Sequence, residues 1–451
     1  MAPATLSHFS VGSGLNAEEL VSSKRILMIC PDVLPWPGLP TTGAGLRAWG
    51  IAKGLESRGH ELIYSVPWLC VERGYKIPHP YVNYCWDMSN IPHLVQKIKP
   101  DIVIFSHWPS VRIERKLDIP TVLDLHGPHM LEREFQRFSD RMSNAQHKAA
   151  ALRKADFFVC AGQKQRLYFL GWLVAAGLPL EALDIAVVPV CLSPQLPVHI
   201  WADGEPVFVY GGMFLPWQDP SVGLYALLRG MEKHARGRLR IFGGRHPMFP
   251  EDFRRIKHFN SLEEILHTHS RVEYRGLVNH DELIEEYCRA HVALDVMAHN
   301  PERELAFTTR TVEYMWCGLP VIYQDFSELS PMIREYEAGW VVNPSDEAQV
   351  EAVIEEALTS PQEVRRRGEN AQQLVRERLV WDKVIEPLDA FCRNPRQIAP
   401  LSMPIWSWRP KSLPGLLREI GRNLRYGGLR AVIYYSKRYV KNLTGSATKN
   451  L

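Results

Sequence analysis

One short segment of the sequence combines hydroxyl, guanidinium and carboxylate groups. Thr308, Thr309, Arg310 and Thr311 lead into a helical pattern that contains Glu313. Hydroxyl residues are typical of a helix N-terminus, where free amides and the helix dipole favour an anion such as a diphosphate. The guanidinium of Arg310 would add a fork of donors to the same oxygens. The alternative, a capped helix with a solvated arginine, stays open.

Glycines follow several apolar runs. Gly211 and Gly212 end one run, and Gly43 and Gly45 lie in a Gly- and Pro-rich loop after another. Two more runs are followed by Gly243, Gly244 and Gly276. Ligands of open parallel sheets bind outside the carboxyl ends of the strands, and glycine permits close backbone approach. We therefore expect these glycines near a ligand, although the turns of any α/β protein also use glycine.

The elements that must position these residues alternate between strand and helix, and the pattern restarts near residue 200. In the first half we predict strands at 25–30, 61–66, 101–105, 120–124, 156–160 and 185–188, with helices over 46–58 and most of 132–154. In the second half we predict strands at 207–210, 238–242, 272–274, 292–296, 320–323 and 339–342. Its helices are predicted at 221–233, 281–289, 308–317, 346–358 and 362–378. The sequence thus predicts an α/β protein with two doubly wound, Rossmann-like domains that face a cleft.

Composition excludes several classes of protein. The chain has 451 residues, of which 46% are hydrophobic and 23% charged, as in ordinary globular proteins. No run approaches the roughly 18 apolar residues of a spanning helix. Residues 1–24 lack the basic and apolar regions of a secretory signal. The eight cysteines form no C-x-x-C pair, which favours reduced thiols over a zinc ribbon or a disulfide framework. Without Asp-x-Asp at a strand end or a His/Cys cluster, no metal site is predicted.

Several motifs resemble those of one enzyme family. Arg58-Gly-His-Glu61 leads into the second strand, and Arg275-Gly-Leu277 precedes an acidic helix. Residues 313–322 read Glu-Tyr-Met-Trp-Cys-Gly-Leu-Pro-Val-Ile, and a glycine and an apolar strand follow at 339–342. Over about 25–392 the chain resembles a GT-B fold glycosyltransferase, closest to glycosyltransferase family 4. The second-half motifs carry most of this resemblance.

The resemblance implies roles for individual residues. Glu313 would hold the nucleotide ribose, and Leu277 would lie with the donor-binding residues. Glu304 would contact the donor sugar as a catalytic residue, although the family's spacing of seven residues would place that glutamate at Leu305. His126, which follows the strand ending at Asp124, would lie near the reacting sugar as the second catalytic candidate. The alternatives are that Glu313 is an ordinary surface glutamate of its helix and that His126 is a structural histidine. His107 and Arg47 are weaker candidates for the same site.

The first βα loop of the second half departs from the family. The family commonly places an arginine and then a lysine after this glycine pair, but residues 213–218 contain no basic residue. The resemblance then leaves the phosphate charge to Arg245, Arg303 or Arg310.

The same resemblance implies the reaction. A hexosyl group would pass from a nucleotide-diphosphate sugar to an acceptor with retention of anomeric configuration. The GT-B scaffold needs no metal and no further cofactor, because the nucleotide sugar is a co-substrate. Closure of the two domains would align both substrates and exclude water.

Charge is distributed unevenly along the chain. Residues 401–451 hold ten Lys and Arg against one acid, which gives this segment a charge of +9. The net charge of the whole chain is +3, so the other 400 residues together carry −6. Apolar residues at helical spacing over 413–443 alternate with basic ones. Such a helix either lies on an anionic membrane surface or packs on the acidic body. The acidic body argues against nucleic acid as a partner.

These expectations combine into five segments: an N-terminal extension at 1–24, an acceptor domain at 25–195, a donor domain at 205–380, a cross-over helix at 381–400 and a basic amphipathic tail at 401–451. The predicted protein is a cytoplasmic glycosyltransferase on the inner face of the membrane. Its acceptor would be a glycan or lipid-linked saccharide in cell-envelope polysaccharide biosynthesis. A GT-B sugar-nucleotide epimerase and a catalytically silent GT-B partner protein are the alternatives.

Overall fold

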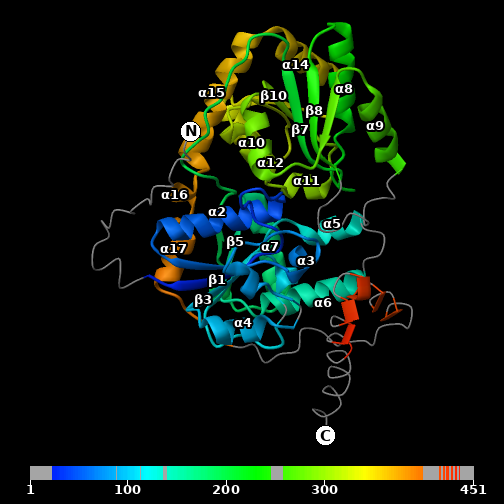
Figure 1. The fold of residues 1–451 in the computed structure, drawn as a ribbon. Coiled ribbons are helices and arrows are strands. Elements are labelled where there is room, and N and C mark those ends of the chain that lie inside the picture. Colours follow the sequence, from blue (N-terminus) through cyan, green and yellow to red (C-terminus); the bar gives the residue numbers. More distant parts are fainter. Residues whose placement is uncertain are drawn as a thin grey trace, which may run out of the picture.

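The computed structural model describes residues 23–87, 89–111, 113–135, 140–244 and 257–399, with scattered residues between 416 and 436. These residues form two α/β domains, one above the other in Figure 1, each built on a parallel sheet of six strands. The predicted fold class is therefore confirmed in its sheets and helices.

The first sheet has the order β2-β1-β3-β4-β5-β6. Its strands are β1 (Arg25–Ile29), β2 (Glu61–Ser65), β3 (Ile102–Phe105), β4 (Thr121–Asp124), β5 (Phe157–Cys160) and β6 (Ile185–Val187). Its helices are α2 (Gly43–Ser57), α3 (Trp68–Glu72), α4 (Ile91–Ile98), α5 (His129–Phe135), α6 (Arg141–Leu152) and α7 (Gln163–Ala175). Short 3-10 turns lie at η1 (Tyr81–Tyr84), η2 (Trp108–Ser110) and η3 (Leu180–Ala182). All twelve predicted strands, counting both sheets, are present.

The second sheet has the order β12-β11-β10-β7-β8-β9. Its strands are β7 (Val207–Met213), β8 (Arg238–Gly244), β9 (Val272–Gly276), β10 (Val292–Asp295), β11 (Val321–Gln324) and β12 (Gly339–Val342). Its helices are α8 (Ser221–Lys233), α9 (Lys257–Thr268), α10 (His280–Cys288), α11 (Pro301–Leu305), α12 (Thr309–Trp316), α13 (Ser330–Tyr336), α14 (Glu347–Thr359) and α15 (Pro361–Arg378). The chain then returns to the first domain through α16 (Trp381–Val384) and α17 (Glu386–Arg393) (Figure 1).

Each sheet is buried on both faces, which explains its nearly continuous apolar strands. In β1, Ile26 and Met28 pack toward the core that contains α2 and α17, whereas Leu27 and Ile29 join the core with α4, α6 and α7. This alternation follows from the two-residue period of a strand. Leu46 of α2 packs into the apolar core of the second domain, so the domains share buried surface.

Three predicted helices differ from the observed ones. The helix predicted at 46–58 begins at Gly43, because Thr42 is its N-cap and its hydroxyl accepts the Gly45 amide hydrogen at 3.3 Å. The helix predicted over 132–154 is divided between α5 and α6. The cross-over helix predicted at 381–400 is divided between α16 and α17 and ends at Arg393; the extended Val380 before it pairs with Leu192.

One carboxylate links the two domains directly. Glu328 of the second domain accepts hydrogen bonds from the amides of Gln163 and Lys164, at 2.7 and 3.0 Å, and so caps α7 of the first domain. Gly162 makes room for it, since a Cβ there would lie 2.5 Å from the Glu328 Cδ. This cap joins the domains at a helix N-terminus, where negative charge is favoured.

Replacing Glu328 by alanine is expected to loosen this link. Hydrogen bonds to a charged acceptor contribute about 1.5–3 kcal/mol, so we expect hydrogen exchange at the Gln163 and Lys164 amides to accelerate by about tenfold or more. Hydrogen–deuterium exchange read by mass spectrometry measures this. Glu335→Ala, at an exposed position in α13, is the matched control and should leave these amides unchanged. Equal exchange in both variants would contradict the link.

The described residues bear on only some of the predictions about the two terminal segments, the cysteines and membrane-spanning helices. No helix in the described ranges is long and apolar enough to cross a membrane. All eight cysteines are buried free thiols. The extension at 1–24 lies almost wholly outside the described residues, and so does most of the tail at 401–451. Among the few tail residues described, Leu417, Leu424 and Leu429 have exposed side chains in helical turns.

Candidate active site

Both sheets have a topological switch point, where successive strands depart to opposite sides, and ligands of such sheets bind there. In the second sheet this point lies between β7 and β10, which are neighbours in the sheet. β7 ends with Gly211, Gly212 and Met213, and β10 ends at Asp295. The sequence-predicted glycines and the start of α12 therefore meet at one edge of the sheet.

The start of α12 faces the first domain. Thr308 is its N-cap, but the Thr308 side chain does not cap the helix; it pairs with the Tyr323 hydroxyl at 3.0 Å. Gly43, at the start of α2, lies against Thr309, because a Cβ on Gly43 would be 2.5 Å from the Thr309 Oγ1. Two helix N-termini from different domains thus lie beside each other. Amides at both are suited to a shared anionic ligand.

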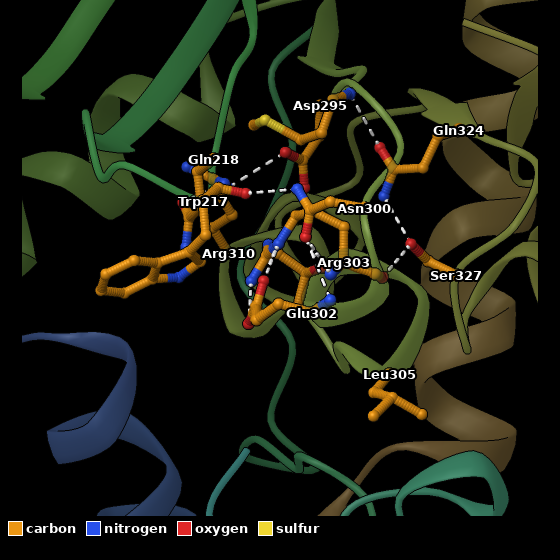
Figure 2. A network of polar contacts seen from close by, with 12 residues as sticks. Trp217, Gln218, Asp295, Asn300, Glu302, Arg303, Leu305, Arg310, Gln324 and Ser327 are labelled. Atoms are coloured by element: carbon orange, nitrogen blue, oxygen red, sulfur yellow. Dashed lines mark hydrogen bonds and ion pairs between the residues drawn. The ribbon is translucent and has the colours of Figure 1, made fainter. Parts of the chain in front are cut away.

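Arg310 is turned into the second domain (Figure 2). Its Nη2 donates to the Gln218 Oε1 at 2.7 Å, and its Nη1 lies 3.3 Å from both the Tyr210 hydroxyl and the Gly211 carbonyl oxygen. Its Nε lies 3.1 Å from the Asp295 Oδ1, and the residue is buried. The guanidinium therefore holds the loop after β7 and neutralises Asp295. Its direct contact with a diphosphate stays a prediction.

Thr311 and Gly212 complete this network. The Thr311 hydroxyl donates to the Asp295 Oδ2 at 2.5 Å. Gly212 has a φ of +142°, and a Cβ there would lie 2.2 Å from the Arg310 Nη1. Gly211 is equally confined, by the Tyr287 hydroxyl. Packing against Arg310 and Tyr287 therefore requires glycine at both positions, whether or not a ligand also approaches them.

Glu313 lies one turn into α12 and is nearly buried. Its Oε1 is 2.6 Å from the His280 Nε2 at the start of α10. Burial alone would lower the pKa of His280, but the hydrogen bond and charge of Glu313 outweigh it and the pKa is raised. His280 therefore orients the carboxylate. Sequence reasoning missed this histidine, although the Asn279 cap before it was a visible signal, its side chain accepting the Glu282 amide hydrogen at 2.9 Å.

This pair gives a pH-dependent prediction. Because the folded pKa of His280 lies above the ordinary 6.5, its contribution to stability is complete below about pH 6.5 and is lost as the pH rises through the folded pKa. His280→Gln should therefore lose the most stability, relative to the native chain, at the acidic end. Melting temperatures across about pH 5.5–8.5 measure this. His93→Gln, at an exposed position, is the control; parallel profiles for His280→Gln and the native chain would refute the prediction.

Glu304 lies on α11, a short helix that sequence reasoning missed. Its side chain is about half exposed, and its Oε2 lies 3.7 Å from the His299 Nε2. The buried carboxylate of this helix is Glu302, whose oxygens accept from the Arg303 Nε and Nη2 at 2.5 and 2.7 Å (Figure 2). The Asn300-Pro301 pair that begins the helix was the available signal.

Arg303 is thus engaged by its neighbour in the sequence. Burial raises the pKa of Glu302, since it disfavours the carboxylate more than the Arg303 charge favours it. The Arg303 carbonyl oxygen also accepts from the Ser327 hydroxyl at 2.8 Å. The phosphate role predicted for Arg303 stays a prediction, and Arg245 lies outside the described residues.

The first domain contributes a group of histidines after β3 and β4. The ring of His107 lies 5.8 Å from that of His126 and 4.8 Å from that of His129, between centroids. The His129 Nδ1 is 2.7 Å from the Glu132 Oε2. Burial lowers the pKa of all three histidines, so their neutral forms are favoured. His126 therefore lies in a cluster rather than alone, and sequence reasoning missed His129 and Glu132.

Of three further residues predicted for the site, two pack on their own domain and one is partly exposed. Gly45 packs on the first domain itself, since a Cβ there would lie 2.0 Å from the Val33 carbonyl oxygen. Arg47 is buried and forms a bidentate ion pair with Asp124, with an Nη2–Oδ1 distance of 2.7 Å. Leu277 is about half exposed. Within the described ranges, no group of three His, Cys, Asp or Glu side chains is arranged to hold a metal ion.

Comparison with known proteins agrees with this architecture. Residues 225–390 match the family model described as glycosyl transferase-like. Sucrose-phosphate synthase from Thermosynechococcus elongatus superposes with a TM-score of 0.62 at 17% identity, covering 82% of this chain and 98% of that chain. Anabaena HepE, solved with UDP-glucose, gives 0.56 at 16% identity, covering 81% and 98%. An alpha-glucosyltransferase solved with UDP gives 0.55 at 12% identity, covering 82% and 100%.

The chain therefore has the GT-B fold, and the match to the glycosyl transferase-like family model falls mainly on its second domain. Placement in family 4 in particular stays a prediction. No curated protein sequence matches the chain.

Proposed function

We propose that this protein is a retaining glycosyltransferase that moves a hexosyl group from a nucleotide-diphosphate sugar to a glycan or lipid-linked saccharide. The main observation behind this proposal is that the N-termini of α2 and α12 are in contact. Gly43 lies against Thr309 beside the switch point of the second sheet. The solved relatives with UDP or UDP-glucose support a uridine nucleotide as the first donor to test.

The leaving diphosphate is the group that such a site must stabilise. Amides at the start of α12 would meet its developing charge without reorganisation, which is the most effective form of electrostatic catalysis. The proposed reaction requires no metal ion. Glu313, held by His280, would accept two ribose hydroxyl hydrogens.

The sugar end of the donor would lie toward α11 and the histidine cluster. We assign Glu304 to the sugar hydroxyls, because it is the exposed carboxylate of α11. His126 would hydrogen-bond the transferred sugar from the first domain. Closure of the domains, fastened by Glu328 on α7, would exclude water that otherwise hydrolyses the donor.

The cellular location of the enzyme is proposed from the sequence alone. A basic, amphipathic tail over 413–443 would hold the enzyme on an anionic, cytoplasmic membrane face, near a lipid-linked acceptor. Cell-envelope polysaccharide assembly would supply such an acceptor.

A second candidate, a silent GT-B binding protein, is favoured by one observation. Arg303 and Arg310 are both occupied by carboxylates, and residues 213–218 supply no cation. A thermal-shift screen of nucleotide sugars, followed by chromatography of the products, separates the candidates. Binding with transfer to an acceptor supports the enzyme, and binding without turnover supports the silent protein. Conversion of the donor without acceptor supports an epimerase, and no binding contradicts all three.

A further inference from the structure

Buried hydrogen-bond donors without partners gather at one edge of the first sheet. Within the described ranges, the Lys148 Nζ has no hydrogen-bond partner although its residue is fully buried. The Trp108 Nε1 and Asn144 Nδ2 are also buried and unpartnered. Native proteins leave few such groups, and a buried water, an ion or a ligand is a common explanation for those that remain. The Trp108 Nε1 and Asn144 Nδ2 are donors only, and so is the Lys148 Nζ in its charged form, so a single acceptor group would complete all three.

The three donors belong to one cluster. Lys148 on α6 lies over the rings of Tyr168, Phe169 and Trp172, with its Nζ between 4.3 and 4.9 Å from their centroids. These rings stabilise a cation but accept no ordinary hydrogen bond. Asn144 lies one helical turn before Lys148, and the turn that contains Trp108 packs on the same helix.

Three half-buried histidines lie beside these donors. The Trp108 ring is 5.6 Å from that of His129, which in turn neighbours His107. The Nδ1 atoms of His107 and His126 are buried and unpartnered as well. His107, His126 and His129 are partly exposed, whereas Lys148 is fully buried.

Nearby carboxylates are already engaged. Glu132 is bonded to His129, and Asp124 is paired with Arg47. Glu302, across the domain boundary, is paired with Arg303. Burial lowers the pKa of Lys148 well below its ordinary value, and the charge of Glu132 opposes this only partly. An anion that reached Lys148 would restore its charged form.

The position of the cluster fits a substrate site. It follows the carboxyl ends of β3 and β4, next to the switch point between β1 and β3. α5, which carries His129 and Glu132, packs against α11 of the second domain, as Figure 1 shows. A group bound here would lie on the first-domain side of the boundary, opposite the proposed donor site.

We propose that Lys148, Trp108, Asn144 and His107 bind an anionic oxygen group of the acceptor, either a sugar carboxylate or a phosphate. This inference rests on the proposed function, because it names the chemistry of the acceptor that the transferase uses. The anion supplies the acceptor oxygens that these buried donors lack.

The test measures binding of small anions to the full chain. D-glucuronate and inorganic phosphate are titrated by calorimetry, with D-glucose as the neutral control and UDP as a separate probe of the donor site. We expect an anion, but not glucose, to bind the native chain. Lys148→Met keeps the shape of the side chain and should weaken anion binding at least tenfold. UDP binding should be unchanged, because Lys148 lies outside the donor site.

Matched variants separate this site from general effects. Lys97→Met removes an exposed lysine that also lies over an aromatic ring, Tyr84, and should leave anion binding unchanged. Trp108→Phe removes the indole donor and should weaken binding too, so it carries the test if Lys148→Met fails to fold.

Preference for glucuronate assigns an acidic-sugar acceptor, and preference for phosphate assigns a phosphate-bearing one. Absence of anion binding, or equal binding by the native chain and both cluster variants, overturns the inference. If UDP binds in that case, only the acceptor site is lost; if no nucleotide sugar of the thermal-shift screen binds either, the proposed function fails with it.

Discussion

Replacing Glu313 by alanine is expected to reduce donor turnover by about a hundredfold or more. A buried carboxylate that accepts two hydroxyl hydrogens contributes about 1.5–3 kcal/mol for each charged hydrogen bond, and 1.4 kcal/mol corresponds to tenfold. The substitution also leaves His280 without the carboxylate that lies 2.6 Å from it. Calorimetric titration with UDP and turnover of the donor identified by the screen measure the effect.

Two controls accompany this variant. Glu285→Ala, also in the second domain, removes an exposed glutamate 3.8 Å from Arg289 and should leave both measurements unchanged. The melting temperature of Glu313→Ala shows whether the fold is kept. A folded Glu313→Ala variant with native UDP affinity would exclude Glu313 from the donor site.

Replacing Gly43 by alanine is expected to disrupt the site as strongly, by a steric route. The added Cβ would lie 2.5 Å from the Thr309 Oγ1, and we expect α2 and α12 to separate to relieve this contact. A displacement of about 1 Å in a site that aligns two substrates lowers the rate by about a hundredfold. Most of the apolar core of each domain lies away from this contact, so the variant should stay folded while it loses donor turnover.

A second substitution distinguishes a clash from a general defect. Thr309→Ala removes the Oγ1 that the new methyl group meets, so the double variant should recover the native compactness in small-angle X-ray scattering. Gly171→Ala is the matched control, because nothing lies within 4 Å of a Cβ there. A Gly43→Ala chain with native turnover, or a double variant as open as the single one, would refute the proposed contact.

The elements of the fold could be predicted from the sequence because each carries its own local pattern. The twelve strands are short apolar runs, and the helix at Ser221–Lys233 coincides with its predicted range. The boundaries that differ depend on longer-range or finer signals. The start of α2 at Gly43 follows from the Thr42 cap, and the break after Leu379 follows from pairing of Val380 with Leu192, far apart in the sequence.

The sequence by itself determined the two-domain fold and predicted that Gly43, Thr309 and Glu313 belong to one donor site. It could not determine which charges are free, since this depends on partners distant along the chain. Arg310 is paired with Asp295, and Arg47 with Asp124. Only the tertiary structure placed His280 on Glu313 and left Lys148 buried without an acceptor. Local patterns set the elements, but burial and charge pairing arise only when those elements pack together.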